Sequence, residues 1–212
     1  YALEELGLER VAIVDWDVHH GNGAQDIFWD STRVLNISLH QDRCFPSDSG
    51  FRDENGGDGA EGYSLNVPLP PGGGDAVYEY ALEQVVVPAL EAFEPQLILV
   101  PCGFDAAILD PLSRMMVRVN GFRRMTQLIV DAAERLCDGR IVFLQEGGYS
   151  PYYVPFCGLS VIEELAGVST GMTEAYEPIV SAMGGDELLA HEQSAVDAAG
   201  ELIIRIGQRS EG

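Results

Sequence analysis

Strand-like apolar runs recur along the chain, separated by segments long enough to hold a helix. Each run is four or five residues long, and such a run bounded by polar residues is typical of a strand buried on both faces of a parallel sheet. A further short strand is expected at Tyr63–Val67, inside a polar segment. The main runs are Val11–Val14, Val34–Ser38, Leu97–Val100 and Ile141–Leu144.

Helical periodicity predicts the elements between these strands. In Phe122–Leu136 the apolar positions recur with a period of about 3.6 residues, as in a helix that buries one face. Asn120 is expected to cap its start, and Asp138-Gly139 to end it. A second helix is predicted over Asp75–Phe93, where Pro88 should kink or break it because proline has no amide hydrogen.

Strands that alternate with helices imply right-handed crossovers and a parallel sheet. The expected fold class is therefore α/β, a three-layer α/β/α arrangement with a mostly parallel sheet, and residues 1–212 suffice for a single domain. A third helix, Asp186–Ile206, belongs to an acidic helical tail, residues 168–212, that is expected to pack on this domain. The polar segment Pro46–Gly74 is too long for an ordinary connector, which is typical of functional or disordered loops.

The first ten residues, Tyr1–Arg10, resemble the end of a helix that is already under way. They lead into a buried strand that has no earlier strand beside it. On this pattern the sequence is expected to be a piece of a larger domain, incomplete at its N-terminus.

Charge narrows the range of partners. The sequence contains thirty-four acidic and twelve basic residues, for a net charge of −22. Such a surface repels phosphates, so direct nucleic acid binding is not expected. No apolar window is long enough to span a membrane, and a homo-oligomer is compatible with the composition.

Four scattered cysteines fit neither a disulfide framework nor a thiolate zinc site, which favours a cytoplasmic protein with reduced thiols. They are Cys44, Cys102, Cys137 and Cys157.

Polar groups follow three of the predicted strands. The first strand ends in Asp15-Trp-Asp17-Val-His19, and side chains two apart on a strand share one face. Asp105 follows the third main run, and Gly147-Gly148-Tyr149 follows the fourth. An isolated Asp-x-His is usually a surface feature. However, the carboxyl ends of parallel strands meet at one edge, where open α/β sheets bind ligands.

The sequence therefore predicts one metal ion held by Asp17, His19 and Asp105. Three protein ligands leave an open coordination position, as in catalytic zinc sites, although the oxygen-rich set also suits iron or cobalt. Tyr149 could then donate its hydroxyl to an oxyanion, and the glycines Gly147 and Gly148 leave room for a substrate. A bridged metal pair is not expected, because further carboxylates are missing at the equivalent positions.

Four motifs together resemble the histone deacetylase family, most closely its class II branch and the bacterial deacetylase-like amidohydrolases. The resemblance covers about Tyr1 to Gly167 and implies an arginase/deacetylase-like fold. It also implies that Asp17, His19 and Asp105 bind Zn²⁺ and that Tyr149 is the hydrogen-bond donor to the transition state. The motifs are Asp15-Trp-Asp-Val-His-His-Gly-Asn-Gly23, Ile37-Ser-Leu-His40, Gly103-Phe-Asp105 with Asp110-Pro111, and Glu146-Gly-Gly-Tyr149.

The resemblance further implies structural K⁺ ions and a substrate channel. Asp15, Ser38 and Leu39 would help to hold one potassium ion, with main-chain oxygens of the zinc ligands. Phe45 would form one wall of a narrow acyl-lysine channel. Leu112 stands where polyamine-specific relatives carry an acidic residue, which favours acetyl-lysine-type substrates. A second potassium would lie on main-chain oxygens of Phe28, Ser31, Val34 and Tyr63.

One part of the family pattern is missing. The family's tandem catalytic histidines lie upstream of the first motif, and His20 is expected to be structural. Because general acid–base catalysis is worth roughly 10²–10⁴-fold, this chain alone is expected to be inactive or nearly so.

The expected function is a zinc-dependent deacetylase that converts N-acetyl-lysine-type amides to acetate and amine. An amidohydrolase for acetylated polyamines or other small acetylated amines, or a non-catalytic acyl-binding module that retains a metal, remains open.

Overall fold

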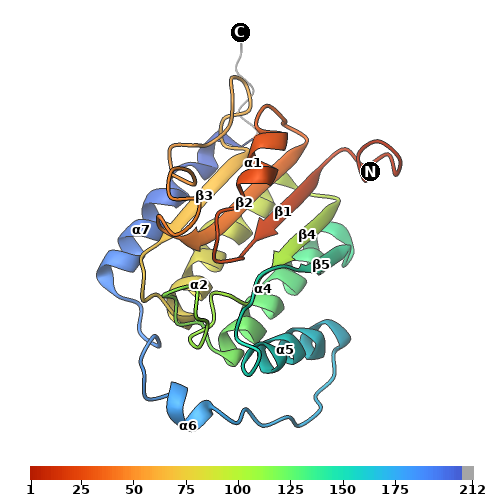
Figure 1. The fold of residues 1–212 in the computed structure, drawn as a ribbon. Coiled ribbons are helices and arrows are strands. Elements are labelled where there is room, and N and C mark those ends of the chain that lie inside the picture. The colour runs from red at the N-terminus through yellow and green to blue at the C-terminus, as the bar shows by residue number, and fades with distance from the viewer. Residues whose placement is uncertain (207–212) are drawn as a thin grey trace.

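Five strands form one sheet in the order β3-β2-β1-β4-β5 (Figure 1). The structure is a computed structural model, and it describes residues 1–206. Every neighbouring pair runs parallel, so the parallel sheet expected from the apolar runs is confirmed. Each strand extends one to three residues beyond its predicted C-terminal end. The strands are β1 Val11–Asp15, β2 Val34–Gln41, β3 Ser64–Leu69, β4 Leu97–Cys102 and β5 Ile141–Gln145.

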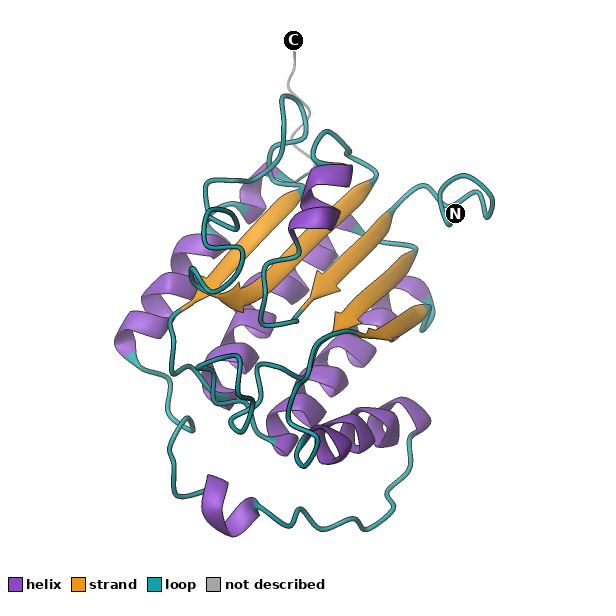
Figure 2. Cartoon of the chain, viewed as in Figure 1, coloured by secondary structure: helices purple, strands orange, loops and turns teal. Residues whose placement is uncertain are grey.

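Helices lie on both faces of this sheet, which confirms the three-layer arrangement (Figure 2). The helix α1 stands on one face, over β1 and β2, and most of the other helices cover the opposite face. The α-helices are α1 Asn22–Phe28, α2 Asp75–Ala81, α3 Val87–Phe93, α4 Val119–Cys137, α5 Val154–Ala166, α6 Glu177–Val180 and α7 Ala190–Gly200, and the other helical turns are η1 Leu82–Val86 and η2 Ile203–Arg205.

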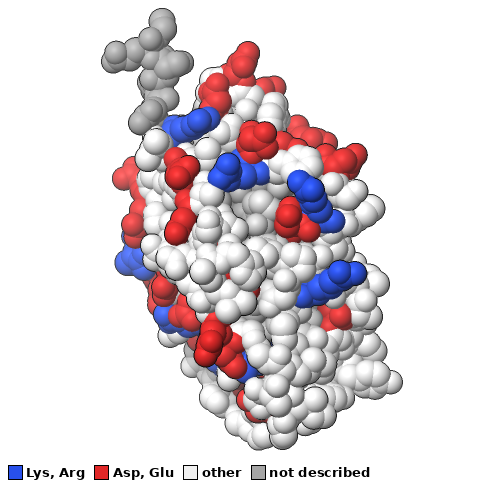
Figure 3. Space-filling model, turned by 90° about the vertical axis from the view of Figure 1, so that its left-hand side faces the viewer, with Lys and Arg blue, Asp and Glu red and all other residues white. Residues whose placement is uncertain are grey.

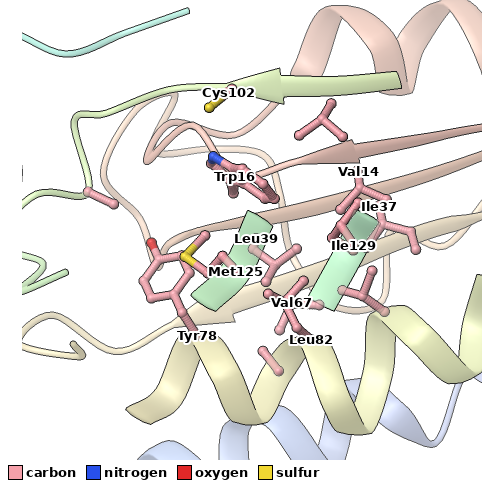
Figure 4. Packing of buried hydrophobic residues seen from close by; sticks show 14 of the residues in the cluster. Val14, Trp16, Ile37, Leu39, Val67, Tyr78, Leu82, Cys102, Met125 and Ile129 are labelled. Atoms are coloured by element: carbon pink, nitrogen blue, oxygen red, sulfur yellow. The ribbon is translucent and has the colours of Figure 1, made fainter. Parts of the chain in front are cut away.

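The main core lies between the sheet and the helices α2 and α4. Val14, Ile37 and Val67 come from three adjacent strands and are fully buried. They face Leu82 and Ile129 from the helical layer (Figure 4). Burial of side chains of this size stabilises the fold by about 1.5–3 kcal/mol each, which explains why the apolar runs predicted the strands well.

The helix predicted over Asp75–Phe93 is continuous in space but changes its winding. Between α2 and α3 lies the π-helical turn η1, in which the amide of Val87 donates to the carbonyl of Leu82. Pro88 stands in the first turn of α3. Because Pro88 has no amide hydrogen and its ring crowds the carbonyl four residues earlier, a wider turn is favoured just before it. The predicted break at Pro88 therefore takes the form of a π-turn.

The long helix α4 begins earlier than predicted, and the expected cap at Asn120 is wrong. The N-cap position is Arg118, in an extended conformation. The carboxylate of Asp75 accepts the Arg118 amide at 2.7 Å and the guanidinium at 3.1 Å, and these bonds fix the chain direction there. The C-terminal end agrees with the prediction, because Asp138 and Gly139 both have positive φ angles, of 52° and 71°.

Two other helix predictions fail at glycines. The residues Tyr1–Arg10 form turns and no helix, with Gly7 in the left-handed region at φ 67°. The C-terminal helix spans Ala190–Gly200 instead of Asp186–Ile206, and Gly184 and Gly185, just before the predicted start, also have positive φ angles. The remainder, α7, packs against β3 and η1. Of the tail 168–212, residues 207–212 lie outside the described residues.

The four cysteines are free, and three of them are buried. Among residues 1–206, no helix is both long and apolar enough to cross a membrane. Figure 3 shows the side of the molecule formed by α7 and its neighbours, where basic side chains lie singly among acidic ones.

Candidate metal centre

The turn after β1 places two of the predicted ligands side by side. The amide of Asp17 donates to the Oδ1 atom of Asp15 at 3.0 Å, and the amide of His19 donates to the Oδ1 atom of Asp17 at 2.9 Å. These local bonds turn the chain tightly at the sheet edge. As a result, Nδ1 of His19 lies 3.0 Å from Oδ1 of Asp17.

The third predicted ligand arrives from the neighbouring strand β4. Asp105 is fully buried, and its Oδ1 atom accepts the amide of Val18 at 2.8 Å. Its Oδ2 atom lies 3.0 Å from Nδ1 of His19 but has no partner in hydrogen-bonding geometry. One ligand atom each from Asp17, His19 and Asp105 fall within 4.8 Å of one another. The structure thus brings together the three residues that the sequence singled out.

The charges of this cluster suit a cation. The carboxylates of Asp105 and Asp17, each with an oxygen 3.0 Å from Nδ1 of His19, raise the pKa of His19 to about 10 because they stabilise its protonated ring. Burial raises the pKa of Asp105, and burial also acts on Asp17, where bonds from His19 and Gly147 outweigh it and lower the pKa. Two carboxylates that stabilise a proton on an imidazole would stabilise a divalent cation in its place. One nitrogen and two oxygens, including a buried oxygen without a partner, are a donor set that fits zinc.

Two glycines leave space beside the carboxylates. A Cβ atom on Gly147 would lie 2.1 Å from Oδ2 of Asp105 and 2.6 Å from Oδ2 of Asp17. A Cβ atom on Gly103 would lie 2.4 Å from the same oxygen of Asp17. The amide of Gly147 also donates to that oxygen at 2.8 Å. Only glycine at position 147 therefore allows the main chain to lie this close to the carboxylates of Asp17 and Asp105.

Aromatic side chains stand beside His19 at the surface. The ring centroids of Phe45 and Tyr149 lie 6.3 and 6.4 Å from that of His19, and both rings are nearly perpendicular to it. Phe45 is 69% exposed and Tyr149 is 48% exposed. A hollow of about 380 Å³ extends from Asp17 and His19 past Tyr149 and Glu146. The predicted wall residue and the predicted hydroxyl donor are thus both at the mouth of the centre.

Asp110 has a role that the sequence analysis did not assign. Its carboxylate accepts the amide of Tyr149 at 2.7 Å through Oδ2 and the amide of Leu112 at 2.8 Å through Oδ1. It therefore links the loop of Tyr149 to the loop of Leu112. The sequence signal was the Asp110-Pro111 pair, which belongs to one of the family motifs. Gly148, next to Tyr149, has a φ of 135° and packs against Phe104.

The residues predicted to hold potassium lie in two places. Asp15 pairs with Ser38 in register on adjacent strands, both are buried, and Leu39 follows directly. Burial raises the pKa of Asp15 well above its ordinary value, so a nearby cation would favour its charged form. The second set lies at the opposite ends of the strands. Phe28, Ser31, Val34 and Tyr63 are found at the end of α1 and at the starts of β2 and β3.

A buried polar network supports the loop that carries Phe45. The main-chain amide of His20 donates to the carbonyl of Phe45, and its ring bonds to Ser49 at 2.9 Å and to Gln25 at 3.2 Å. The ring also packs against His40, with centroids 4.9 Å apart. His20 lies outside the cluster of three ligands. His20 and His40 belong to two of the family motifs, but no sequence pattern pointed to Ser49 and Gln25, which are scattered polar residues.

Comparisons with known proteins identify the family of this chain. The histone deacetylase domain family matches residues 1–165. Over 168 residues, 79% of this chain, the sequence is 55% identical to the histone deacetylase-like amidohydrolase of Pseudomonas aeruginosa, of which 44% is covered. It is 41% identical to a probable deacetylase of Archaeoglobus fulgidus over 78% of this chain and 46% of that protein.

A solved structure of a histone deacetylase has the same fold as this chain. The structure of the histone deacetylase Clr3 superposes with a TM-score of 0.83 at 29% identity, over 98% of this chain and 34% of that one. The fold is thus the arginase/deacetylase-like α/β fold that the motifs implied. The matched stretch spans less than half the length of these two curated relatives. The match to most of its residues shows that the chain belongs to the histone deacetylase family.

Proposed function

We propose that this chain carries the metal-binding part of a zinc-dependent deacetylase that hydrolyses N-acetyl-lysine-type amides to acetate and a free amine. The observation that carries the proposal is the convergence of Asp17, His19 and Asp105 beside Tyr149 at the carboxyl ends of β1, β4 and β5. Membership of the histone deacetylase family supports the same reaction class.

Asp17, His19 and Asp105 would hold the zinc ion, which when bound polarises the amide carbonyl and lowers the pKa of a water molecule. Tyr149 contributes a hydrogen-bond donor. Burial and the charges of Asp105 and Asp17 raise the pKa of its hydroxyl, so it retains its proton for donation. A donor that meets the developing oxyanion stabilises the transition state more than the ground state.

Substrate access is supported by the mouth of the centre. The exposed ring of Phe45 would form one wall of a narrow channel, and Gly147 and Gly148 would keep the opposite side free of side chains. Leu112 is apolar and 55% exposed. An apolar residue there offers no charge to a polyamine, which supports an acetyl-lysine-type substrate over an acetylated polyamine. Structural potassium at the two proposed places and a cytoplasmic location also remain proposals.

Among residues 1–206, no histidine other than His19 lies in the cluster of proposed ligands to transfer a proton. His20 and His40 are buried against each other, and His191 lies in α7. Burial and the neighbouring His20 lower the pKa of His40 to about 4, so it is neutral and poorly placed to act as an acid. We therefore expect the chain by itself to hydrolyse substrate roughly 10²–10⁴-fold more slowly than a complete enzyme.

Metal content tests the ligand assignment. The variant Asp105→Ala should lose stoichiometric zinc, measured by mass spectrometry of the purified protein for metal. Asp138→Ala, a substitution of an exposed carboxylate 88% accessible at its side chain, should leave the zinc in place. Zinc content unchanged in Asp105→Ala would overturn the ligand set.

Substrate preference is tested separately. A complete enzyme that contains this chain should deacetylate an acetyl-lysine peptide faster than acetylspermidine. Tyr149→Phe should lower turnover with zinc retained. A preference for acetylspermidine would refute the substrate proposal, and no turnover of either substrate by a zinc-loaded complete protein would favour a non-catalytic acyl-binding module.

A further inference from the structure

The helix α1 contacts the sheet through a polar side chain. Among the residues of α1, all of which the structure describes, Gln25 alone is buried, at 5% exposure, whereas Ile27 on the same helix is 75% exposed. A helix that lies on a sheet ordinarily buries its apolar side chains. The reverse arrangement indicates that the buried position needs hydrogen-bonding groups, and departures of this kind are expected at functional sites.

The neighbours of Gln25 fix the orientation of its amide group. Its Oε1 atom accepts a hydrogen bond from Nδ2 of Asn66 in β3 at 2.7 Å. Its Nε2 atom donates to Oε2 of Glu54 at 2.8 Å. Because a carboxylate oxygen accepts and an amide nitrogen donates, turning the amide of Gln25 around would break both bonds. The oxygen therefore faces Asn66, and the nitrogen faces Glu54.

This orientation decides how His20 forms its hydrogen bonds. Nε2 of His20 lies 3.2 Å from Oε1 of Gln25, which is an acceptor, so the ring hydrogen of the neutral histidine is on Nε2. Nδ1 then accepts the hydroxyl of Ser49 at 2.9 Å. In the main chain, the amide of His20 donates to the carbonyl of Phe45 at 3.2 Å. Gln25 thus orients the histidine that holds both Phe45 and Ser49.

The segment that receives these bonds is the Phe45 loop, residues 42–63, between β2 and β3. The Phe45 loop consists of turns and bends, so its position depends on contacts with its surroundings. The bonds reach it at Phe45, Ser49 and Glu54. Glu54 also ties the loop to itself, because its Oε2 atom accepts the amide of Gly50 at 2.9 Å.

We propose that Gln25 is a positioning residue for the substrate channel. Through His20 and Glu54, it sets where the ring of Phe45 stands at the mouth of the centre. The inference rests on the proposed deacetylase function, in which Phe45 forms one wall of the channel. Gln25 itself does not line the hollow at the centre. A wall that contacts the substrate equally in the ground state and the transition state affects KM and leaves kcat unchanged.

A charge swap tests the proposal in a complete enzyme that contains this chain. Gln25→Glu keeps the shape of the side chain and the acceptor for His20, but it places a second carboxylate against Glu54, where like charges repel. The KM for an acetyl-lysine peptide should rise roughly tenfold, while kcat stays within about twofold of the parent. Adding Glu54→Gln restores a donor opposite the new carboxylate, so the KM of the double variant should return to within about threefold of the parent.

Hydrogen exchange gives a second measurement that needs no turnover. The amide of His20 is bonded to the carbonyl of Phe45, so its exchange rate reports whether Phe45 is in place. In this chain, Gln25→Glu should speed exchange at that amide at least roughly tenfold, and the double variant should reverse most of the change. If a complete enzyme does not turn over the peptide, the proposed function fails, and the exchange rates still decide the role of Gln25.

The matched control is Thr126→Val, which keeps the shape of a buried side chain and removes one hydrogen bond, from Thr126 to the carbonyl of Phe122. Thr126 lies in α4, on the other face of the sheet from α1 (Figure 1). This variant should be less stable than the parent, yet its KM and its exchange rate at His20 should stay within about twofold.

Glu54→Ala covers the case in which Gln25→Glu does not fold, because Glu54 is only partly buried. It removes one attachment of the Phe45 loop and should raise both the KM and the exchange rate at His20 roughly threefold. The proposal is overturned if the exchange rate at His20, or the KM of an active enzyme, changes no more in these variants than in Thr126→Val. It is also overturned if the double variant is no closer to the parent than Gln25→Glu.

Discussion

The two halves of the sheet are built from similar apolar sequences but are buried to very different degrees. In β1 and β2 every residue is buried, and in β3 all but one are. In β4 buried residues alternate with partly exposed ones, and β5 has none that is fully buried. The difference lies in what covers them. The first half has α1 and a long loop on one face and helices on the other, whereas β4 and β5 are open on the α1 face (Figure 1).

The proposed metal centre lies on the border between these halves. Asp17 and His19 follow β1 in the covered half, while Asp105 and Gly147 follow β4 and β5 in the open half. The ligands are held by bonds that cross the border, from Val18 to Asp105 and from Gly147 to Asp17. The geometry of the centre therefore depends on both halves, although only one of them is closed on both faces.

The largest expected effect contrasts the two halves directly. Ile37→Ala in β2 removes a fully buried side chain and should lower the free energy of unfolding by about 2–5 kcal/mol. Leu144→Ala in β5 removes a side chain that is 44% exposed and should cost less than about 1 kcal/mol. Urea denaturation measures both. Equal losses would show that β5 is as well covered as β2.

A second contrast tests the network behind the centre in the covered half. Gly50 and Gly59 both have a φ of 82°, but a Cβ atom on Gly50 would lie 2.6 Å from Nε2 of His40 and 2.7 Å from the ring of His20, while nothing lies near Gly59. Gly50→Ala should therefore destabilise the protein by about 1–3 kcal/mol more than Gly59→Ala. Because both glycines have the same φ, alanine causes similar backbone strain in the two variants. Equal urea midpoints would therefore show that the rings of His20 and His40 move aside at little cost.

A third contrast probes the border itself. Gly147→Ala places a Cβ atom among the carboxylate oxygens and should weaken zinc binding at least about tenfold, or about 1.4 kcal/mol. The control is Gly23→Ala, because a Cβ atom there has no neighbour within 4 Å. Competition with a chromophoric zinc chelator gives both affinities. If Gly147→Ala binds zinc as tightly as Gly23→Ala, the main chain at Gly147 does not shape the site.

Sequence reasoning succeeded where one local rule decided the outcome. The apolar runs located all five strands, and because parallel strands share a carboxyl edge, the spacing of Asp17, His19 and Asp105 was enough to bring them together. It was less successful where the outcome depends on contacts between residues that are distant in the sequence. Nothing near Asn120 reveals that Asp75 holds the amide of Arg118 and starts the helix earlier. The role of Asp110 likewise depends on a contact with Tyr149, which is far from it in sequence.

The smallest effect is expected at Glu163 of α5, the helix beside the open half of the sheet, and it depends on pH. Glu163 of α5 accepts hydrogen bonds from Thr170 and Arg123, which lower its pKa to about 2 from an ordinary 4.5. A carboxylate with a lowered pKa adds stability that is present above pH 4.5 and is lost as the pH falls toward 2. Glu163→Gln should therefore be less stable than the parent at pH 7, and the gap between the two urea midpoints should shrink to a minor part of its pH 7 size by about pH 2.5. A gap between the midpoints that stays constant from pH 7 to that value would show that the carboxylate charge is not what fastens the start of the tail to α5.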